Sequence, residues 1–367
     1  MKKILLLFLT TLVLTSCDSE GDDQQAAQYN FDRAAFLSNL VEARVHPAFA
    51  KAQQELAQLQ TATTAYVANR NLTTLQDLRA VWLGAYTAYQ ATAMFTTGPS
   101  ERLNYNFQMN VFPTNVADIE NNVNNGGYDL AAVGNNDAVG FPAVEYLIYG
   151  EDTTDNEVLE QFNDDRRNIY LQDLVSQMVN LTTTVANEWL NSYATTFINS
   201  TGNTATSSVN VFINDFIFYY EKTFRSNKIA IPAGVFSNLP LPNRVEGLYS
   251  KNFSRQLALE SLDQFIATFQ GTSFDGTASN AGLDSFLTAV RGDAASEQNL
   301  SNQILDQLAT ARELIAGLDE NLSRQVQNDN TSMTRTYDEL QKAVVLLKVD
   351  MLQSLSISVD FVDADGD

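Results

Sequence analysis

Glu145 is the acidic residue whose local sequence suggests chemistry most directly. It stands three positions after Pro142 in the segment from Gly140 to Gly150. Proline is well suited to the first position of a helix, where its missing N–H costs nothing, so Glu145 is predicted in or near a first helical turn. The helix dipole favours a carboxylate there, and we expect Glu145 to be ionised. A glutamate in this position also has a purely structural explanation, in which it only complements the dipole.

Two basic residues, Arg225 and Lys228, form a second candidate pair. They are three positions apart, and residues at this spacing share one face of an α-helix. Such a pair would either neutralise nearby acids or bind an anion. Charged residues beside apolar stripes need a partner or a ligand, because an unpaired buried charge is strongly destabilising. A buried ion-pair network is therefore the structural alternative to a binding site.

The elements that must position these residues are predicted to be helices. Leu75, Leu78, Trp82, Ala85 and Tyr89 recur at spacings of three and four, as expected for one buried helix face, and residues 333–351 show the same pattern. Seven prolines in 367 residues permit long helices, with Pro47 kinking or restarting the first. The other predicted helices cover residues 34–68, 155–199, 207–226, 251–269, 282–290 and 297–321.

The predicted fold class is all-α, in two helical domains. Roughly 340 residues of helix exceed what one bundle core usually holds. Residues 96–140, rich in asparagine and glycine, and residues 229–249, with three prolines, lack clean periodicity. Long irregular segments in a helical protein tend to be functional, so both are candidates for one shared site.

The N-terminus predicts a lipoprotein. Lys2 and Lys3 precede an apolar run that is too short to span a bilayer, and Leu14-Thr-Ser-Cys17 has the pattern of a lipobox. Cys17, the single cysteine of the chain, is the expected lipidation site. The predicted organisation is then a signal peptide over residues 1–16 and an acidic tether over residues 17–30.

The charge of the chain excludes one class of partner. The net charge is −22, and removal of residues 1–16 would leave 20 basic and 44 acidic side chains, a net charge of −24. Nucleic acid is an improbable partner, since phosphate binding needs concentrated positive charge. We expect a lipid-anchored protein of a Gram-negative cell envelope, in the outer membrane. The acidic residues after Cys17 leave the face of the membrane undetermined.

Several motifs along the chain resemble the imelysin-like family, in its branch of periplasmic or surface lipoproteins. Pro142 and Glu145 stand in a Gly-x-Pro-x-x-Glu motif, where the family signature is Gly-x-His-x-x-Glu. The resemblance runs from about Phe31 to the C-terminus. Its other motifs are Trp82-x-x-x-Tyr86, Thr97-Gly-Pro99, Asn110-Val-Phe-Pro113, Arg225-x-x-Lys228-Ile-Ala-Ile-Pro232-Ala-Gly234, Leu241-Pro-x-x-Val-Glu246 and the stretch from Leu347 through Asp350 to Asp367.

This resemblance implies two four-helix bundles with a site at their interface, and a role in bacterial iron uptake. We assign residues 31–150 to the first bundle region and residues 151–367 to the second, with helices free to cross between them. The residues implied for ligand binding are Glu145, Arg225, Lys228, Glu246 and Asp350. The carboxylates Glu145, Glu246 and Asp350 would suit iron or another hard cation, and the hydroxyls of Tyr86, Tyr146 and Tyr249 could add to them.

Three functions follow from these observations. The first is a membrane-anchored, non-enzymatic binding protein in uptake of iron or an iron complex. The second is a hydrolase, since imelysins were once classed as metallopeptidases; a usual zinc site takes several histidines, and this chain has only His46. The third is a helical module that docks onto an outer-membrane receptor or transporter for iron. The aspartates near Asp367 are expected to form a solvated tail.

Overall fold

The computed structural model describes residues 31–237, 239–278, 281–296 and 299–360. The predicted signal peptide, tether and Cys17 lie outside the described residues, as do residues 361–367. The described residues from Phe31 to Asp360 form one compact unit. The described residues are helical with connecting loops and contain no strand, which confirms the all-α prediction. Among them, no helix is long and apolar enough to cross a membrane.

The first helices of the chain form around the predicted apolar stripes. A π-helical segment, η1, joins α1 to α2 without a break, and Pro47 lies in the first turn of α2, so the helix runs on through Pro47 instead of restarting there. Asn71 caps α3 by accepting the N–H of Thr74 at 3.1 Å. The elements are α1 (Arg33–Asn39), η1 (Leu40–Val45), α2 (His46–Ala68), α3 (Leu72–Gln90), α4 (Pro99–Arg102), α5 (Tyr105–Met109), α6 (Val116–Asn125), η2 (Val133–Asn135) and α7 (Gly140–Tyr149).

The middle of the chain departs from the prediction in two places. Asp164 caps a new helix, so the predicted helix over residues 155–199 is broken after Gln161. The helix over residues 207–226 continues as a π-helical segment to Ala230, and this form is rare beyond a single turn. The elements are α8 (Asp155–Gln161), α9 (Asp165–Glu188), η3 (Trp189–Tyr193), α10 (Ala194–Asn199), α11 (Ser208–Phe218), η4 (Tyr219–Ala230), α12 (Ile231–Ala233) and η5 (Pro242–Arg244).

The last third of the chain follows the predicted helices closely. The helix predicted over residues 297–321 ends at Ala316, and a short helix follows it. The helix predicted over residues 333–351 ends in a π-helical segment that carries Asp350. The elements are α13 (Ser254–Phe269), α14 (Leu283–Arg291), α15 (Leu300–Ala316), α16 (Leu322–Asn328), α17 (Asn330–Val345), η6 (Leu346–Met351) and α18 (Leu352–Leu355).

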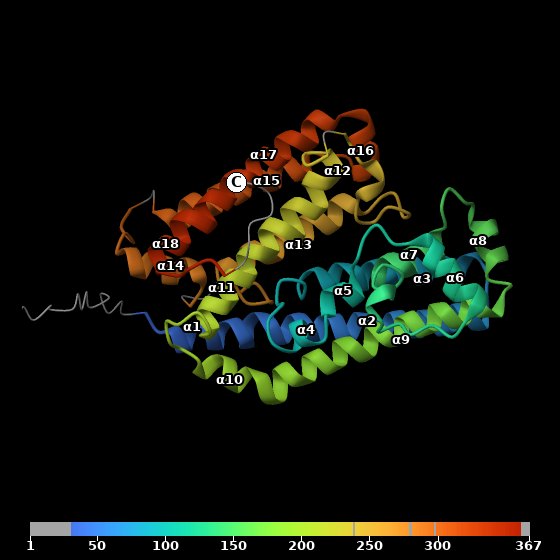
Figure 1. Ribbon diagram of the computed structural model, residues 1–367, viewed down its shortest axis with the longest axis horizontal. Helices are drawn as coiled ribbons and strands as arrows, with labels where there is room; N and C mark the ends of the chain where they lie inside the picture. Colours follow the sequence, from blue (N-terminus) through green and yellow to red (C-terminus); the bar gives the residue numbers. More distant parts are fainter. Residues whose placement is uncertain (1–30, 238, 279–280, 297–298, 361–367) are drawn as a thin grey trace, which may run out of the picture. The chain divides into compact units, whose positions relative to one another are not determined.

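Helices within residues 31–360 pack in two sets that also contact each other. Figure 1 shows α2, α3, α7 and α9 running beside one another, and α2 packs along both α3 and α9. In the other set, α17 packs on α15 and η4, and α13 packs on α15. The two sets meet where α3 packs on α13. Because α9 packs on α2, helices from both sides of residue 150 share a layer, and the predicted division into two bundle regions stays a prediction.

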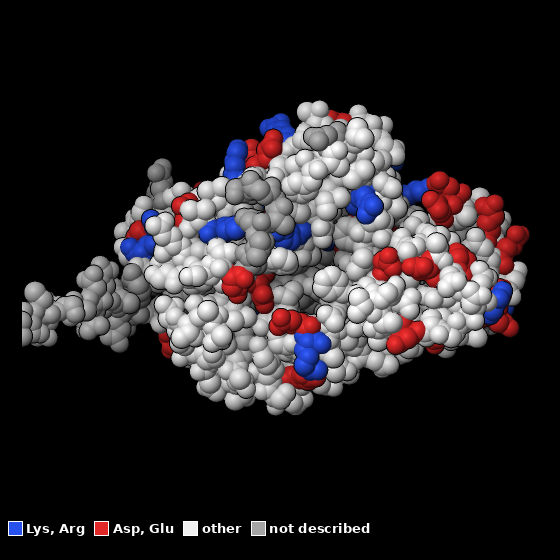
Figure 2. All heavy atoms as spheres, in the orientation of Figure 1, with Lys and Arg blue, Asp and Glu red and all other residues white. Residues whose placement is uncertain are grey.

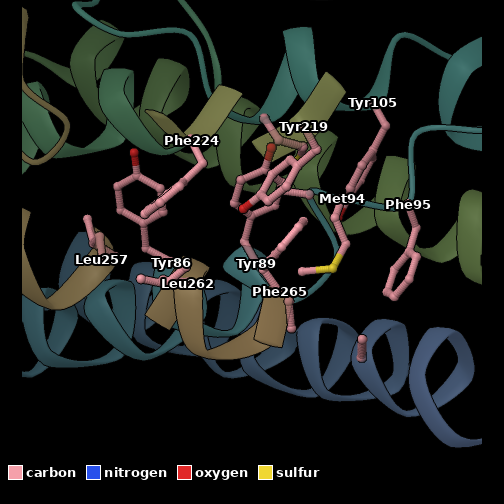
Figure 3. Close-up of a cluster of buried hydrophobic side chains, with 14 of the residues drawn as sticks. Tyr86, Tyr89, Met94, Phe95, Tyr105, Tyr219, Phe224, Leu257, Leu262 and Phe265 are labelled. Carbon is pink, nitrogen blue, oxygen red and sulfur yellow. The ribbon is translucent and has the colours of Figure 1, made fainter. Parts of the chain in front are cut away.

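Aromatic side chains fill the region between these sets. Tyr86 and Tyr89 of α3, Tyr219 and Phe224 of η4 and Phe265 of α13 belong to the cluster shown in Figure 3. All five are at most 2 % exposed. Stacked and edge-on rings of this kind add to the burial of apolar area, so the cluster holds α3, η4 and α13 in fixed positions. Acidic side chains instead gather on the surface, most visibly at the end with α6 and α8 in Figure 2.

Candidate functional site

Helix α7 places Glu145 in the interior. It begins at Gly140, whose φ of +74° suits glycine, and a Cβ there would lie 2.2 Å from the Met109 carbonyl oxygen. Pro142 is the third residue of the helix, where it removes no backbone hydrogen bond. Glu145 is therefore in the second turn instead of the first, and its side chain faces the neighbouring helices with 2 % exposure.

The packing of Glu145 opposes the ionisation that its place in the helix favours. Burial raises the pKa of Glu145 to about 7; hydrogen bonds from Ser250 oppose this rise, and the negative charge of Glu246 adds to it. The backbone N–H of Ser250 donates to Glu145 Oε1 at 2.8 Å. Loss of hydration outweighs the helix dipole here, because the dipole contributes only about 0.3–1 kcal/mol at a typical helix end. Glu145 is thus a group that exchanges a proton near pH 7.

Glu246 is held by three donors from separate parts of the chain. It follows η5, is 2 % exposed, and forms an ion pair with Lys228 of η4. Gln90 Nε2, at the end of α3, donates to Glu246 Oε1 at 3.2 Å, and Asn110 Nδ2 donates to the same oxygen at 2.7 Å. Both carboxylate oxygens are therefore hydrogen-bonded, which a buried charge requires.

These contacts close into a ring of polar groups. Lys228 Nζ also donates to Gln90 Oε1 at 3.1 Å, and Ser261 Oγ donates to that oxygen at 2.8 Å. The Tyr86 hydroxyl donates to Asn110 Oδ1 at 2.5 Å. We call Tyr86, Gln90, Asn110, Lys228, Glu246 and Ser261 the Glu246 cluster.

Burial dominates the electrostatics of the Glu246 cluster. It lowers the pKa of Lys228, and the charge and hydrogen bond of Glu246 oppose this effect. It also raises the pKa of Tyr86 well above its usual value, and the charges of Glu246 and Glu145 add to the rise. The cluster therefore joins α3, η4 and α13 through one charged pair that is shielded from solvent.

Arg225 does not belong to this cluster, although its spacing predicted a common face with Lys228. Its Nη1 donates to the Tyr337 hydroxyl at 3.1 Å and to Gln341 Oε1, both on α17. The reason is the π-helical geometry of η4, in which each turn holds more residues than in an α-helix. Residues three apart then point in different directions, so the two cations serve different sites.

Asp350 is also placed elsewhere. It lies half-buried in η6, which packs on α15, α17 and α18, whereas Glu246 lies between η5 and α13. Within the described residues, no group of three or more His, Cys, Asp or Glu side chains could hold a metal ion. The predicted metal set of Glu145, Glu246 and Asp350 is therefore not brought together. Glu145, Glu246 and Lys228 do lie in one neighbourhood.

The other candidates from the sequence have ordinary packing roles. His46 is half-buried at the start of α2, with Nε2 at 3.4 Å from the Trp189 carbonyl oxygen. The rings of Tyr146 and Tyr249 pack edge-on with centroids 5.3 Å apart, and the Tyr146 hydroxyl donates to Glu120 at 2.8 Å. Both phenols are partly exposed next to the buried Glu145.

Gln90 and Ser261 are cluster members that sequence reasoning missed. Gln90 continues the buried stripe of α3, four residues after Tyr86, and is 1 % exposed. A polar residue on an apolar stripe was the available signal. Two pockets, of about 260 and 430 Å³, lie elsewhere: the first is lined by residues of α2 and α9, and the second opens between α2, α3 and α13. Neither is lined by Glu145 or Glu246.

Comparisons with known proteins agree with the architecture. Two solved structures are similar to this chain. An imelysin-like protein from Psychrobacter arcticum 273-4 has a TM-score of 0.70 at 20 % identity, covering 90 % of this chain and 97 % of that one. A putative iron-regulated protein A precursor from Parabacteroides distasonis ATCC 8503 has a TM-score of 0.73 at 16 % identity, covering 87 % and 95 %.

No curated protein matches the chain closely enough to add to these. The model of the peptidase M75 family, described as Imelysin, matches residues 45–350. This match spans most of the chain, including α7 with Glu145, the Glu246 cluster and the helices that position them. The chain therefore belongs to the imelysin family.

Proposed function

We propose that the protein is a lipid-anchored binding protein of bacterial iron acquisition, which binds iron or an iron complex without covalent chemistry. The observation that carries this proposal is the burial of two carboxyls and one ammonium close together: Glu145 on α7, Lys228 on η4 and Glu246 after η5. Membership of the imelysin family supports it. So does the similar fold of a protein described as a putative iron-regulated protein A precursor.

The geometry favours a complexed form of iron over a bare ion at Glu246. A cation that coordinates Glu246 would have to displace Lys228 and the amide donors of Gln90 and Asn110. An iron complex brings its own ligands and can be recognised by hydrogen bonds and charge at the rim of such a cluster. Glu145 would adjust to the charge of the bound species, because its proton is exchangeable near pH 7.

Iron binding can be tested directly with the ferric nitrilotriacetate complex as the probe. We expect the purified protein to retain about one iron per chain after gel filtration, measured by elemental analysis. Glu246→Gln and Glu145→Gln should weaken retention at least about tenfold while circular dichroism stays helical. Asp152→Asn is the matched control, because it removes an exposed carboxylate that pairs with Lys251 at the surface. Absence of iron from the unaltered protein, or equal retention in all variants, would refute the proposal.

The name of the family makes peptide cleavage the second function to test. Zinc peptidases use histidines or histidines with a glutamate around an activated water. The one histidine of this chain lies against Trp189, and Pro142 cannot act as a ligand. We therefore expect no peptide hydrolysis by purified protein supplied with Zn²⁺. Hydrolysis that a chelator inhibits and Glu145→Ala abolishes would establish the peptidase instead.

The cellular location is part of the same proposal. Lipidation at Cys17 would hold the protein at the outer membrane of a Gram-negative cell, where iron complexes pass to receptors and transporters. A protein of net charge −22 would be repelled by nucleic acid and by anionic lipid surfaces, so we propose the covalent anchor as the means of membrane association.

A further inference from the structure

A cavity outside the Glu246 cluster lies where α2, α3 and α13 meet. Its volume is about 430 Å³, within the range of roughly 300–1,000 Å³ that small-molecule sites occupy, whereas the groove between α2 and α9 is smaller, at about 260 Å³. None of the described residues that line this cavity belongs to the Glu246 cluster. Its chemistry is therefore independent of the proposed iron site.

Helix α3 forms a low floor for this cavity. Ala80, Gly84 and Ala88 follow one another at four-residue spacing, so they lie in one row along the helix. Glycine inside a helix is less favourable than alanine, so its use here needs a reason from packing. A Cβ at Gly84 would lie 3.2 Å from Glu55 Oε2, which is tighter than an ordinary contact. Gly84 therefore keeps the floor open and lets the Glu55 carboxylate lie against α3.

Two carboxylates line the cavity, and they differ in their partners. Glu55 of α2 has a cation, because Lys51 Nζ lies 2.6 Å from its Oε1. Glu260 of α13 is half-buried and accepts a hydrogen bond from Gln264 Nε2 at 2.8 Å, and among the described residues no cation forms an ion pair with it. Burial raises the pKa of Glu260, and the hydrogen bond from Gln264 opposes this rise. A cation that entered the cavity would stabilise the ionised form of Glu260.

Arg44 of η1 does not supply that cation, because its guanidinium has other partners. Its Nη2 donates to Gln264 Oε1 at 2.5 Å, and its Nη1 donates to the Thr272 carbonyl oxygen at 3.2 Å. Its guanidinium carbon lies 5.4 Å from the centre of the Phe274 ring. Gln264 and Phe274 both line the cavity. Arg44 thus orients two of its walls, and the Gln264 amide is turned with its nitrogen towards Glu260.

We propose that this cavity binds a small aliphatic amine in its ammonium form. The ammonium donates hydrogen bonds to Glu260, and the hydrocarbon lies on the row of small residues of α3, beside Leu83 and Phe274. An anion is disfavoured, because the described lining carries two glutamates and one lysine. A metal ion is disfavoured as well, since the described residues offer no group of three His, Cys, Asp or Glu that could hold one. The strong negative charge of the chain attracts small cations to its surface.

Isothermal titration calorimetry with three probes of equal chain length, pentylamine, pentanol and pentanoate, tests this proposal. At pH 7 we expect the purified protein to bind one pentylamine per chain. Pentanol and pentanoate should bind at least about tenfold more weakly, because neither can donate a charged hydrogen bond to Glu260. Equal affinity for pentylamine and pentanol would overturn the proposal, since the cavity would then recognise only hydrocarbon. Absence of pentylamine binding would overturn it too.

Three variants locate the bound amine. Glu260→Gln should weaken pentylamine binding at least about tenfold by removing the charge. Gly84→Ala should weaken it several-fold by raising the floor, although alanine favours the helix, so a loss of folding does not explain that result. Asp152→Asn removes a surface carboxylate paired with Lys251 and should bind the amine as the unaltered protein does. Equal binding by Glu260→Gln and the unaltered protein would overturn the proposal.

A lysine side chain of another protein carries the same ammonium group as a free amine. Nα-acetyl-lysine amide, which presents that side chain with a blocked backbone, is therefore a further probe. We expect pentylamine to bind more tightly than this probe, because the cavity has to enclose only the amine and its hydrocarbon. Binding of Nα-acetyl-lysine amide without binding of pentylamine would overturn the proposal in favour of a protein partner.

Discussion

Replacing Glu145 by glutamine should change how the stability of the protein depends on pH. Glutamine keeps the shape of the side chain and cannot ionise. The folded-state pKa of Glu145 is about 7, raised by burial from the usual 4.5. A carboxyl with a raised folded pKa contributes its full stability below pH 4.5, and this contribution is lost as the pH rises through 7, because the unfolded chain ionises more readily.

The magnitude follows from the same two pKa values. A difference of about 2.5 pKa units corresponds to about 3 kcal/mol of unfolding free energy lost above pH 8. About 1 kcal/mol of this is already lost at pH 5, so roughly 2 to 3 kcal/mol changes between pH 5 and pH 8. The difference in unfolding free energy between Glu145→Gln and the unaltered protein should shift by this amount in favour of glutamine.

Urea denaturation at pH 5 and pH 8, followed by circular dichroism, measures this difference. Asp215→Asn is a matched variant, because burial also raises the pKa of Asp215 to about 7, at a place in α11 away from the cluster. Each variant should remove its own part of the pH dependence, and the double variant should remove both. If Glu145→Gln keeps the full pH dependence while Asp215→Asn reduces it, Glu145 does not titrate near 7 and the account of its burial is wrong.

Three further predictions concern the cluster, the backbone and the anchor. Lys228→Met should lower the unfolding free energy, measured by urea denaturation, by about 3–5 kcal/mol, because it leaves Glu246 buried without its cation. Adding Glu246→Leu should recover most of this loss. No recovery would mean that the two residues are not energetically coupled. Gly140→Ala should lower the unfolding free energy by about 3 kcal/mol or more, because its Cβ would collide with the Met109 backbone. Gly126→Ala is also at positive φ but has no atom within 4 Å of the added Cβ, so it should lower the unfolding free energy by only about 1–2 kcal/mol. Similar losses in the two variants would contradict the steric explanation. Cys17→Ser should release the folded protein from the membrane fraction, and unchanged partitioning in a membrane flotation assay would rule out the lipid anchor.

Local rules explain why the helices could be predicted. Apolar residues at spacings of three and four, such as Leu78, Trp82 and Tyr89, must face a core whatever the partner helix is, and all three are at most 2 % exposed. Pro47 lies just after the π-helical segment η1, and its missing N–H is again a local effect. The all-α fold and most of the helix positions therefore follow from residues that are only a few positions apart in the sequence.

The candidate site could be predicted only in part. Glu145, Lys228 and Glu246 were recognisable as charged residues beside apolar stripes or prolines, and the structure brings them together. Arg225 and Asp350 carried the same signals but contact other helices, because the π-helical form of η4 and the packing of η6 turn them away. A spacing rule assumes a regular α-helix, and only the packed structure shows where that regularity ends.

The sequence alone therefore determined the helical periodicity, the strong negative charge and the presence of single histidine and cysteine residues that limit the chemistry. Only the tertiary structure decided which charges are buried together and how far burial shifts the pKa of Glu145. The proton affinity of Glu145 depends on how much water the packing of α7 removes, and the pairing of Lys228 with Glu246 depends on three segments meeting in space. Both are properties of contacts between residues far apart in the chain, and hydration and Coulomb energies vary with distance in space rather than with position in the sequence.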